Sequence, residues 1–156
     1  MSTAAEPRRF ATFSVADMFC GIDVAQVQEV LKYQEMTPVP LVHDVIQGLI
    51  NLRGQIVTAI DLRRRFRLPE RAADQKPMNI VLRCEGGAVS LLVDEIGDVI
   101  EVDAWEHEAP PSTMDAFHRD MVQEVFKLDG ALLLALDTAK VLSLEAEAQQ
   151  NEGSAR

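Results

Sequence analysis

Residues Gly48–Phe66 read GLINLRGQIVTAIDLRRRF, and this stretch decides the fold. It contains two short apolar runs, Leu49–Leu52 and Gln55–Ile60, joined at Arg53-Gly54. Both runs have the length of a β-strand, and a glycine-containing turn between such runs predicts a β-hairpin. Asp61 follows the second run, where its carboxylate can accept hydrogen bonds from the first N–H groups of a short helix. The stretch therefore predicts a strand, a turn, a strand and a capped helix.

The same block occurs a second time at Gly130–Leu142, where Asp137 follows Asp61 by 76 positions (137 − 61). Asp137 is therefore expected to cap a second short helix. A second pair of similar segments lies upstream of these blocks. In this pair Asp98 follows Glu29 by 69 positions (98 − 29), and both residues have apolar neighbours. Self-similarity of this kind indicates two related β-rich halves.

The rest of the chain alternates short apolar runs with turn signals. Roughly ten short strands and almost no long helix predict an all-β barrel architecture. The polar stretch Pro69–Pro77 is the expected crossing between the halves, and Val42–Ile46 is expected to form a single helical turn. Some predicted strands carry neighbouring apolar residues that point to both faces. We therefore expect the outer faces to be covered by the other half or by a partner protein.

Composition excludes several functional classes. Hydrophobic residues make up 47% of the chain and charged residues 26%, which is typical of a globular domain. The formal net charge of −10 argues against binding nucleic acid. No apolar run is long enough to span a bilayer, and the first residues lack the apolar core of a signal peptide, so we expect a cytoplasmic location. Cys20 and Cys84 are expected to be free thiols.

Catalytic or metal-binding patterns are not recognisable in the sequence. His43, His107 and His118 have no ligand spacing, and the carboxylates Glu106 and Glu108 lie in an acidic loop. We therefore expect no enzyme activity, no cofactor and no metal site. A further cluster is basic and is expected to be a solvated helix face, with an anion site as the alternative; its members are Arg63, Arg64, Arg65 and Arg67.

Several motifs occur together in a recognisable order. They are Ile22-Asp23, Val27-Gln28-Glu29-Val30, Thr37-Pro38-Val39-Pro40, Gly48–Gly54, Asp61-Leu62, Leu92-Val93-Asp94 with Val99, and Leu136-Asp137. Together they resemble the CheW family of bacterial chemotaxis coupling proteins. The resemblance extends from about Phe10 to Leu144, and its most specific motif is Asn51-Leu52-Arg53-Gly54.

This resemblance implies a single CheW-like domain over residues 8–145, with flexible tails at 1–7 and 146–156. Within it the family has two intertwined, five-stranded, SH3-like barrels that share a hydrophobic core, here expected at about 24–76 and 77–137. The family has no catalytic activity. Its members bridge the cytoplasmic tip of a methyl-accepting chemoreceptor to the regulatory domain of a CheA-type histidine kinase.

By the same resemblance, five residues fall at positions that the family uses for receptor or kinase contact: Val27, Glu29, Gly48, Arg53 and Val99. Arg53 is expected at a hairpin tip, where a guanidinium could bind a carboxylate or carbonyl groups. Gly48 could allow close approach of another backbone or could simply be required by a turn. Val27 could belong either to the core or to a contact surface.

Two alternatives stay open at the level of sequence. One is a CheW-like adaptor that serves a kinase pathway other than swimming, such as surface motility. The other is an unrelated SH3-like module that binds peptides, for which one Trp and one Tyr offer little aromatic surface.

Overall fold

The computed structural model describes residues 7–103 and 107–144. Of the predicted tails at 1–7 and 146–156, all residues except Pro7 lie outside the described residues, as do Trp105 and Glu106 of the predicted acidic loop. In chain order the first part contains β1 (Arg8–Val15), β2 (Met18–Asp23), the 3-10 turn η1 (Val24–Gln26), β3 (Val27–Leu31), β4 (Ile46–Leu52), β5 (Gln55–Asp61) and α1 (Leu62–Arg65). The second part contains β6 (Met78–Cys84), β7 (Gly87–Val93), β8 (Glu95–Val102), β9 (His107–Glu108), α2 (Ala116–Met121), β10 (Val122–Leu128), β11 (Ala131–Leu136) and α3 (Thr138–Val141).

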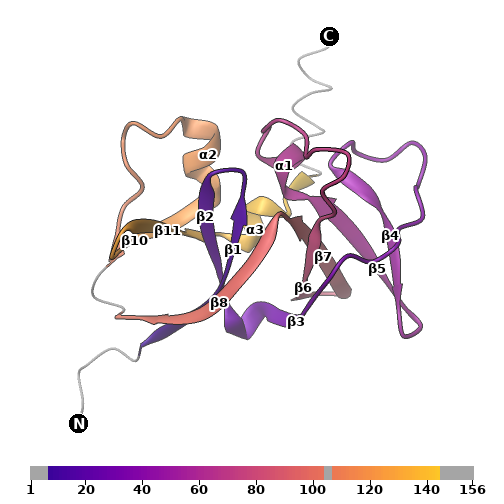
Figure 1. Ribbon diagram of the computed structural model, residues 1–156, viewed down its shortest axis with the longest axis horizontal. Coiled ribbons are helices and arrows are strands. Elements are labelled where there is room, and N and C mark those ends of the chain that lie inside the picture. Colours follow the sequence, from indigo (N-terminus) through magenta and orange to yellow (C-terminus); the bar gives the residue numbers. More distant parts are fainter. Residues whose placement is uncertain (1–6, 104–106, 145–156) are drawn as a thin grey trace.

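The strands form two sheets, which Figure 1 shows beside each other with α1 and α3 toward the middle. A six-stranded sheet has the order β8-β1-β2-β11-β10-β9, and a five-stranded sheet has the order β3-β6-β7-β5-β4. The prediction of an all-β fold is confirmed. The predicted helical turn at Val42–Ile46 is wrong, because this segment is a turn that leads directly into β4.

The two sheets repeat one pattern of strand pairing. Thr58 on β5 lies beside Val89 on β7 in parallel pairing, and Leu134 on β11 lies beside Cys20 on β2 in the same way. The hairpin β1–β2 thus completes the sheet built by β8–β11, and the hairpin β6–β7 completes the sheet built by β3–β5. Each repeat therefore lends its first hairpin to the other repeat, which makes the two barrels intertwined.

Because of this exchange, the boundary between the sheets along the chain differs from the boundary between the sequence repeats. We expected the halves to divide at 76/77, which is where the sequence repeat begins again. In the second half of the chain, the five-stranded sheet ends at Val93 on β7 and the six-stranded sheet resumes at Glu95 on β8. Whether 24–76 and 77–137 behave as separate lobes stays a prediction.

Both sheets curl toward closed barrels of the SH3-like kind. In the five-stranded sheet β3 and β4 are the opposite edges, yet Thr37, shortly after β3, exchanges two backbone hydrogen bonds with Leu49 on β4 (2.9 and 2.8 Å). In the other sheet β8 and β9 are the edges, and β9 follows β8 in the chain and pairs with β10. The chain that leaves one edge therefore returns at the other.

The apolar residues form three clusters that explain why strands are buried on both faces. The largest cluster includes Phe13, Ile22, Leu82 and Leu134 and is shared between the sheets. A smaller cluster around Val57 lies inside the five-stranded barrel, and another around Phe126 lies inside the six-stranded barrel. The expected coverage of one half by the other is thus provided by the shared cluster.

Candidate functional site

The five residues predicted to contact partners lie on three strands and one turn. Val27 and Glu29 are on β3, Arg53 is in the β4–β5 turn, and Val99 is on β8. Gly48 is in β4 and is buried. The exposed members therefore lie on strand edges and at a hairpin tip, not around an enclosed pocket.

Glu29 and Arg53 form an ion pair between β3 and the β4–β5 turn, with the Arg53 guanidinium donating to the Glu29 carboxylate. The Glu29 side chain is 22% exposed and that of Arg53 is 69% exposed. The hydrogen bond from Arg53 holds the pKa of Glu29 below its usual value. We expected the Arg53 guanidinium to bind a carboxylate or carbonyl groups, and in the structure it binds the Glu29 carboxylate of the same chain.

Arg53 adopts a backbone conformation that is unusual for a residue with a side chain. Its φ is 52° and that of Gly54 is 88°, the left-handed pair required by a type I′ hairpin turn. Asn51 supports the turn, because its side-chain oxygen accepts a hydrogen bond from the Gly54 N–H (2.9 Å). The Asn-Leu-Arg-Gly motif therefore projects the Arg53 side chain from a strained but supported tip.

Val99 is 61% exposed on β8, an edge strand of the six-stranded sheet. The repeat with an offset of 69 residues makes Val99 equivalent to Val30 on β3 (99 − 30 = 69). Val30 is 45% exposed. The two valines pair equivalently, since Val30 is opposite Ile80 and Val99 is opposite Ala11. We did not name Val30 as a site residue, although the sequence repeat could have identified it.

Val27 and Gly48 have structural surroundings. Val27 is half-buried and packs against the shared core cluster. A Cβ atom on Gly48 would lie 2.7 Å from the backbone oxygen of Thr37. The close backbone approach that we expected at Gly48 thus occurs within the chain, at the contact that closes the barrel.

The two aspartates cap the short helices that follow them. Asp61 accepts a hydrogen bond from the Arg63 N–H (3.1 Å), and Asp137 accepts one from the Lys140 N–H (3.2 Å). Asp61 has a second function, because Arg71 donates to the same carboxylate at 3.2 Å.

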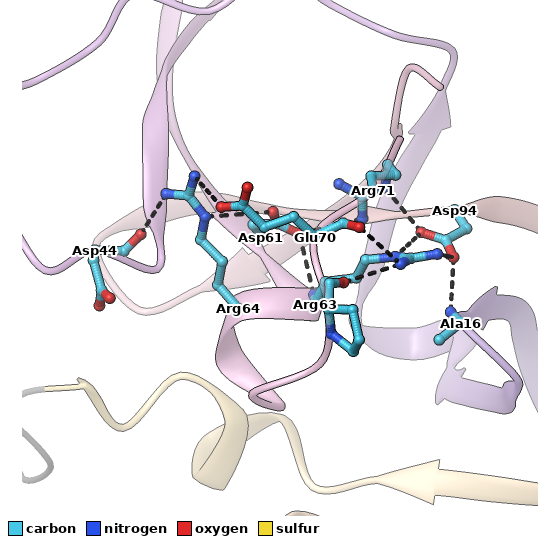
Figure 2. A network of polar contacts seen from close by, with 9 residues as sticks. Ala16, Asp44, Asp61, Arg63, Arg64, Glu70, Arg71 and Asp94 are labelled. Carbon is cyan, nitrogen blue, oxygen red and sulfur yellow. Dashed lines mark hydrogen bonds and ion pairs between the residues drawn. The ribbon is translucent and has the colours of Figure 1, made fainter. Parts of the chain in front are cut away.

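A buried charged cluster, formed by Asp61, Arg63, Arg71 and Asp94, was missed by sequence reasoning (Figure 2). Burial alone would raise the pKa of Asp94, but hydrogen bonds from Arg63, Ala16 and Arg71 outweigh burial and lower this pKa to about 2. The cluster contains two carboxylates and two guanidinium groups, so its charges balance.

The prediction that the basic cluster is a solvated helix face is wrong for two of its four arginines. Arg65 is buried, and its side chain donates to the backbone oxygens of Val141 (2.7 Å) and Lys140 (2.9 Å). Arg63 belongs to the buried charged cluster, with its side chain 14% exposed. Arg67 is exposed, and Arg64 is partly exposed while it donates to the Asp44 backbone oxygen and the Glu70 carboxylate. The four arginines thus divide between the interior and the surface, because Arg65 binds α3 and Arg63 binds Asp94.

Within residues 7–103 and 107–144, no group of three or more His, Cys, Asp or Glu side chains is arranged to hold a metal ion. The described helices are also too short and too polar to cross a membrane. Cys20 and Cys84 are both free thiols. The structure thus defines an all-β protein of two curled sheets with valines and a hairpin-tip arginine exposed at its surface.

Comparison with known proteins identifies the family. Residues 9–146 match the CheW-like domain. The chain is 33% identical to the chemotaxis protein CheW of Bacillus subtilis, covering 88% of each chain. It is 30% identical to CheW of Klebsiella aerogenes, covering 88% of this chain and 83% of that protein.

A solved structure gives the same answer for the fold. The scaffolding protein TtCheW from Thermoanaerobacter tengcongensis superposes with a TM-score of 0.74 at 30% sequence identity, covering 88% of both chains. The chain belongs to the CheW-like domain family, a family of non-catalytic adaptors in chemotaxis.

Proposed function

We propose that this protein is a non-catalytic adaptor that couples the cytoplasmic tips of chemoreceptors to the regulatory domain of a CheA-type histidine kinase. The observation that carries the proposal is the family match over residues 9–146 together with apolar side chains left exposed at equivalent positions of both halves. It acts in the cytoplasm, at the inner membrane face when receptors are assembled in arrays.

We call the residues proposed to contact partners the docking surface, and Val30 and Val99 are its proposed apolar contacts. Both are exposed beside apolar neighbours that pack inward, since Leu31 and Ile100 contact the cores of their own barrels. A partner helix with an apolar stripe would bury these valines without requiring either barrel to open. Val27 lies on the same strand as Val30 and is half-buried against the shared core, so we propose it as a partly buried contact.

Arg53 and Glu29 are the proposed polar contacts. The exposed guanidinium keeps donor groups available beyond the one that binds Glu29, because arginine carries five N–H donors in a planar fork. A partner carbonyl or carboxylate could therefore bind the pair without breaking it. Gly48 contributes indirectly, by allowing the Thr37 contact that holds the Arg53 hairpin in place.

Quantitative binding to purified partners tests the proposal. The probes are a receptor signalling-tip fragment and the kinase regulatory domain from the same bacterium, measured by isothermal titration calorimetry. We expect wild type to bind both, Val99→Asp to lose one of them, and Arg53→Ala to weaken binding while changing unfolding free energy by less than about 0.5 kcal/mol.

Val42→Asp is the matched control, because Val42 is also an exposed valine (41%) but lies in the loop before β4. Val42→Asp is expected to bind as wild type does. Binding of neither partner by well-folded wild type would contradict the adaptor function. Equal loss of folding and binding in Arg53→Ala would show that Arg53 is structural.

A further inference from the structure

The chain passes between the two sheets at two places. The first crossing runs from β2 through η1 to β3, and the second runs from β7 to β8. The second crossing is a single residue, Asp94, which stands between Val93 at the end of β7 and Glu95 at the start of β8. The direction in which β8 leaves the five-stranded sheet therefore depends on how Asp94 is held.

Asp94 is held through both its backbone and its side chain. Its N–H donates to the Ser14 backbone oxygen (2.9 Å), and its carboxylate accepts from the Ala16 N–H (2.7 Å). Ser14 ends β1's pairing with β8, and Ala16 lies in the β1–β2 turn. These contacts tie the crossing to the six-stranded sheet.

Two arginines tie the same carboxylate to the segment that follows β5 of the five-stranded sheet. Arg63, on α1, donates to Asp94 at 2.6 and 2.9 Å, and Arg71, in the segment that connects α1 to β6, donates at 2.8 Å. Arg71 also reaches Asp61 at the end of β5, which Figure 2 shows beside the same cluster. One carboxylate thus joins α1, the connecting segment and the β1–β2 turn.

The cluster is buried, which makes its geometry stiff. The side chains of Asp94 and Arg71 are 7% and 8% exposed. Charges in such surroundings interact more strongly than on the surface and are little screened by salt. Fork-shaped guanidinium groups also fix direction, which a lysine ammonium would not do.

We propose that Asp94, Arg63 and Arg71 are positioning residues that set the angle between the two sheets and thereby the placement of Val99 on β8 relative to Val30 on β3. β8 begins at the residue after Asp94, and Val99 follows on the same strand. None of the three residues belongs to the proposed docking surface. The consequence for partner binding rests on the proposed function, whereas the angle between the sheets does not.

The test uses the full chain and two variants, Arg71→Met and Asp94→Asn. Residual dipolar couplings of backbone N–H groups measure the angle between the sheets, and calorimetry measures affinity for the receptor signalling-tip fragment. We expect both variants to change the angle and to weaken affinity by about fivefold or more, within the usual range of coupling between sites. Arg71→Lys should differ from wild type in both the angle and the affinity, since one ammonium cannot bridge Asp61 and Asp94 as the guanidinium does.

A control separates positioning from simple loss of stability. Val57→Ala removes a fully buried side chain inside the five-stranded barrel, away from Asp94. This variant should lower the denaturant midpoint and leave the angle and the affinity unchanged.

An unchanged angle in Arg71→Met and Asp94→Asn would overturn the proposal, whatever their stability. A changed angle with unaltered affinity would overturn the claim about Val99. If wild type bound no receptor fragment, the proposed function would fail, and the couplings alone would still decide whether these residues position the sheets.

Discussion

The two crossings between the sheets occupy equivalent places in the repeat, but different chemistry holds them. Asp94 corresponds to Ala25 (94 − 25 = 69), and Arg63 corresponds to Ala139 (139 − 63 = 76). The buried pair of charges at one crossing is therefore a pair of alanines at the other. The fold tolerates both solutions, so the charged cluster is a feature of this half and not a requirement of the architecture.

The first crossing depends on hydrogen bonds near the surface. Gln26 donates its side-chain N–H to the Thr138 hydroxyl (2.9 Å), and Arg83 donates to the backbone oxygens of Ala25 (3.2 Å) and Val27 (3.0 Å). All of these contacts are exposed, and exposed hydrogen bonds contribute little because water competes for the same groups. One crossing is thus held by buried charges and the other by contacts that exchange readily with solvent.

The largest predicted effect is on stability at Asp94. Asp94→Ala leaves Arg63 and Arg71 buried without one of their carboxylates, and breaking a buried ion pair costs about 3 to 5 kcal/mol. Urea unfolding monitored by fluorescence and circular dichroism measures the loss. Gln26→Ala, at the other crossing, should cost less than about 1.5 kcal/mol. Equal losses at the two crossings would remove the distinction between them.

The same comparison can be made with acid. The pKa of Asp94 is lowered from 3.8 to about 2 in the folded protein, so its ionised form contributes stability above pH 3.8. That contribution is lost as the pH falls toward 2, because the folded state then gives up its charged form. Thermal midpoints measured from pH 5 to pH 2 should fall less steeply in Asp94→Asn than in wild type. Identical slopes would show that Asp94 does not carry this dependence.

The two caps should differ although both end a strand and begin a short helix. Asp137→Ala removes a helix cap and should cost about 1 kcal/mol. Asp61→Ala also removes a carboxylate that binds Arg71, so its cost should be about 3 kcal/mol when a charged hydrogen bond is added. Denaturant midpoints of the two variants provide the comparison. A cost at Asp137 equal to or above that at Asp61 would contradict the second role of Asp61.

A smaller effect on stability is predicted at Gly48, where the two barrels differ in sequence. Its equivalent in the second half is Glu124 (124 − 48 = 76), whose side chain binds Arg8. Gly48→Ala would push a Cβ against the Thr37 carbonyl, and forced overpacking costs about 1 to 3 kcal/mol. Chemical denaturation tests this, with Arg53→Ala as the nearby surface control. A neutral Gly48→Ala would show that the barrel can relax at the Thr37 contact.

Much of the fold could be predicted from local patterns. The hairpin at Arg53-Gly54 and the caps at Asp61 and Asp137 follow from turn and capping chemistry within a few residues. The repeat was visible because its spacing is preserved in sequence. The exchange of hairpins was not, because pairing of β5 with β7 and of β11 with β2 depends on contacts that no local pattern encodes.

The site could be predicted less completely. Arg53 and Val99 are exposed as a contact surface requires, but the partner of Arg53 within the chain lies 24 positions away and has no sequence signal. Arg71 and Asp94 are 23 positions apart and come from a connecting segment and a strand end, where no periodicity applies. Arg63 and Arg65 were misjudged because a run of arginines usually marks a solvated surface, and here tertiary packing overrides that tendency.

The most direct measurement is the mass of the complex formed with both partners at once. Size-exclusion chromatography with light scattering would be applied to this protein mixed with the receptor signalling-tip fragment and the kinase regulatory domain. The adaptor account predicts one complex that contains all three components, with the receptor fragment or the kinase domain lost in Val99→Asp. Mutually exclusive binding of the two partners by wild type would contradict an adaptor that couples them.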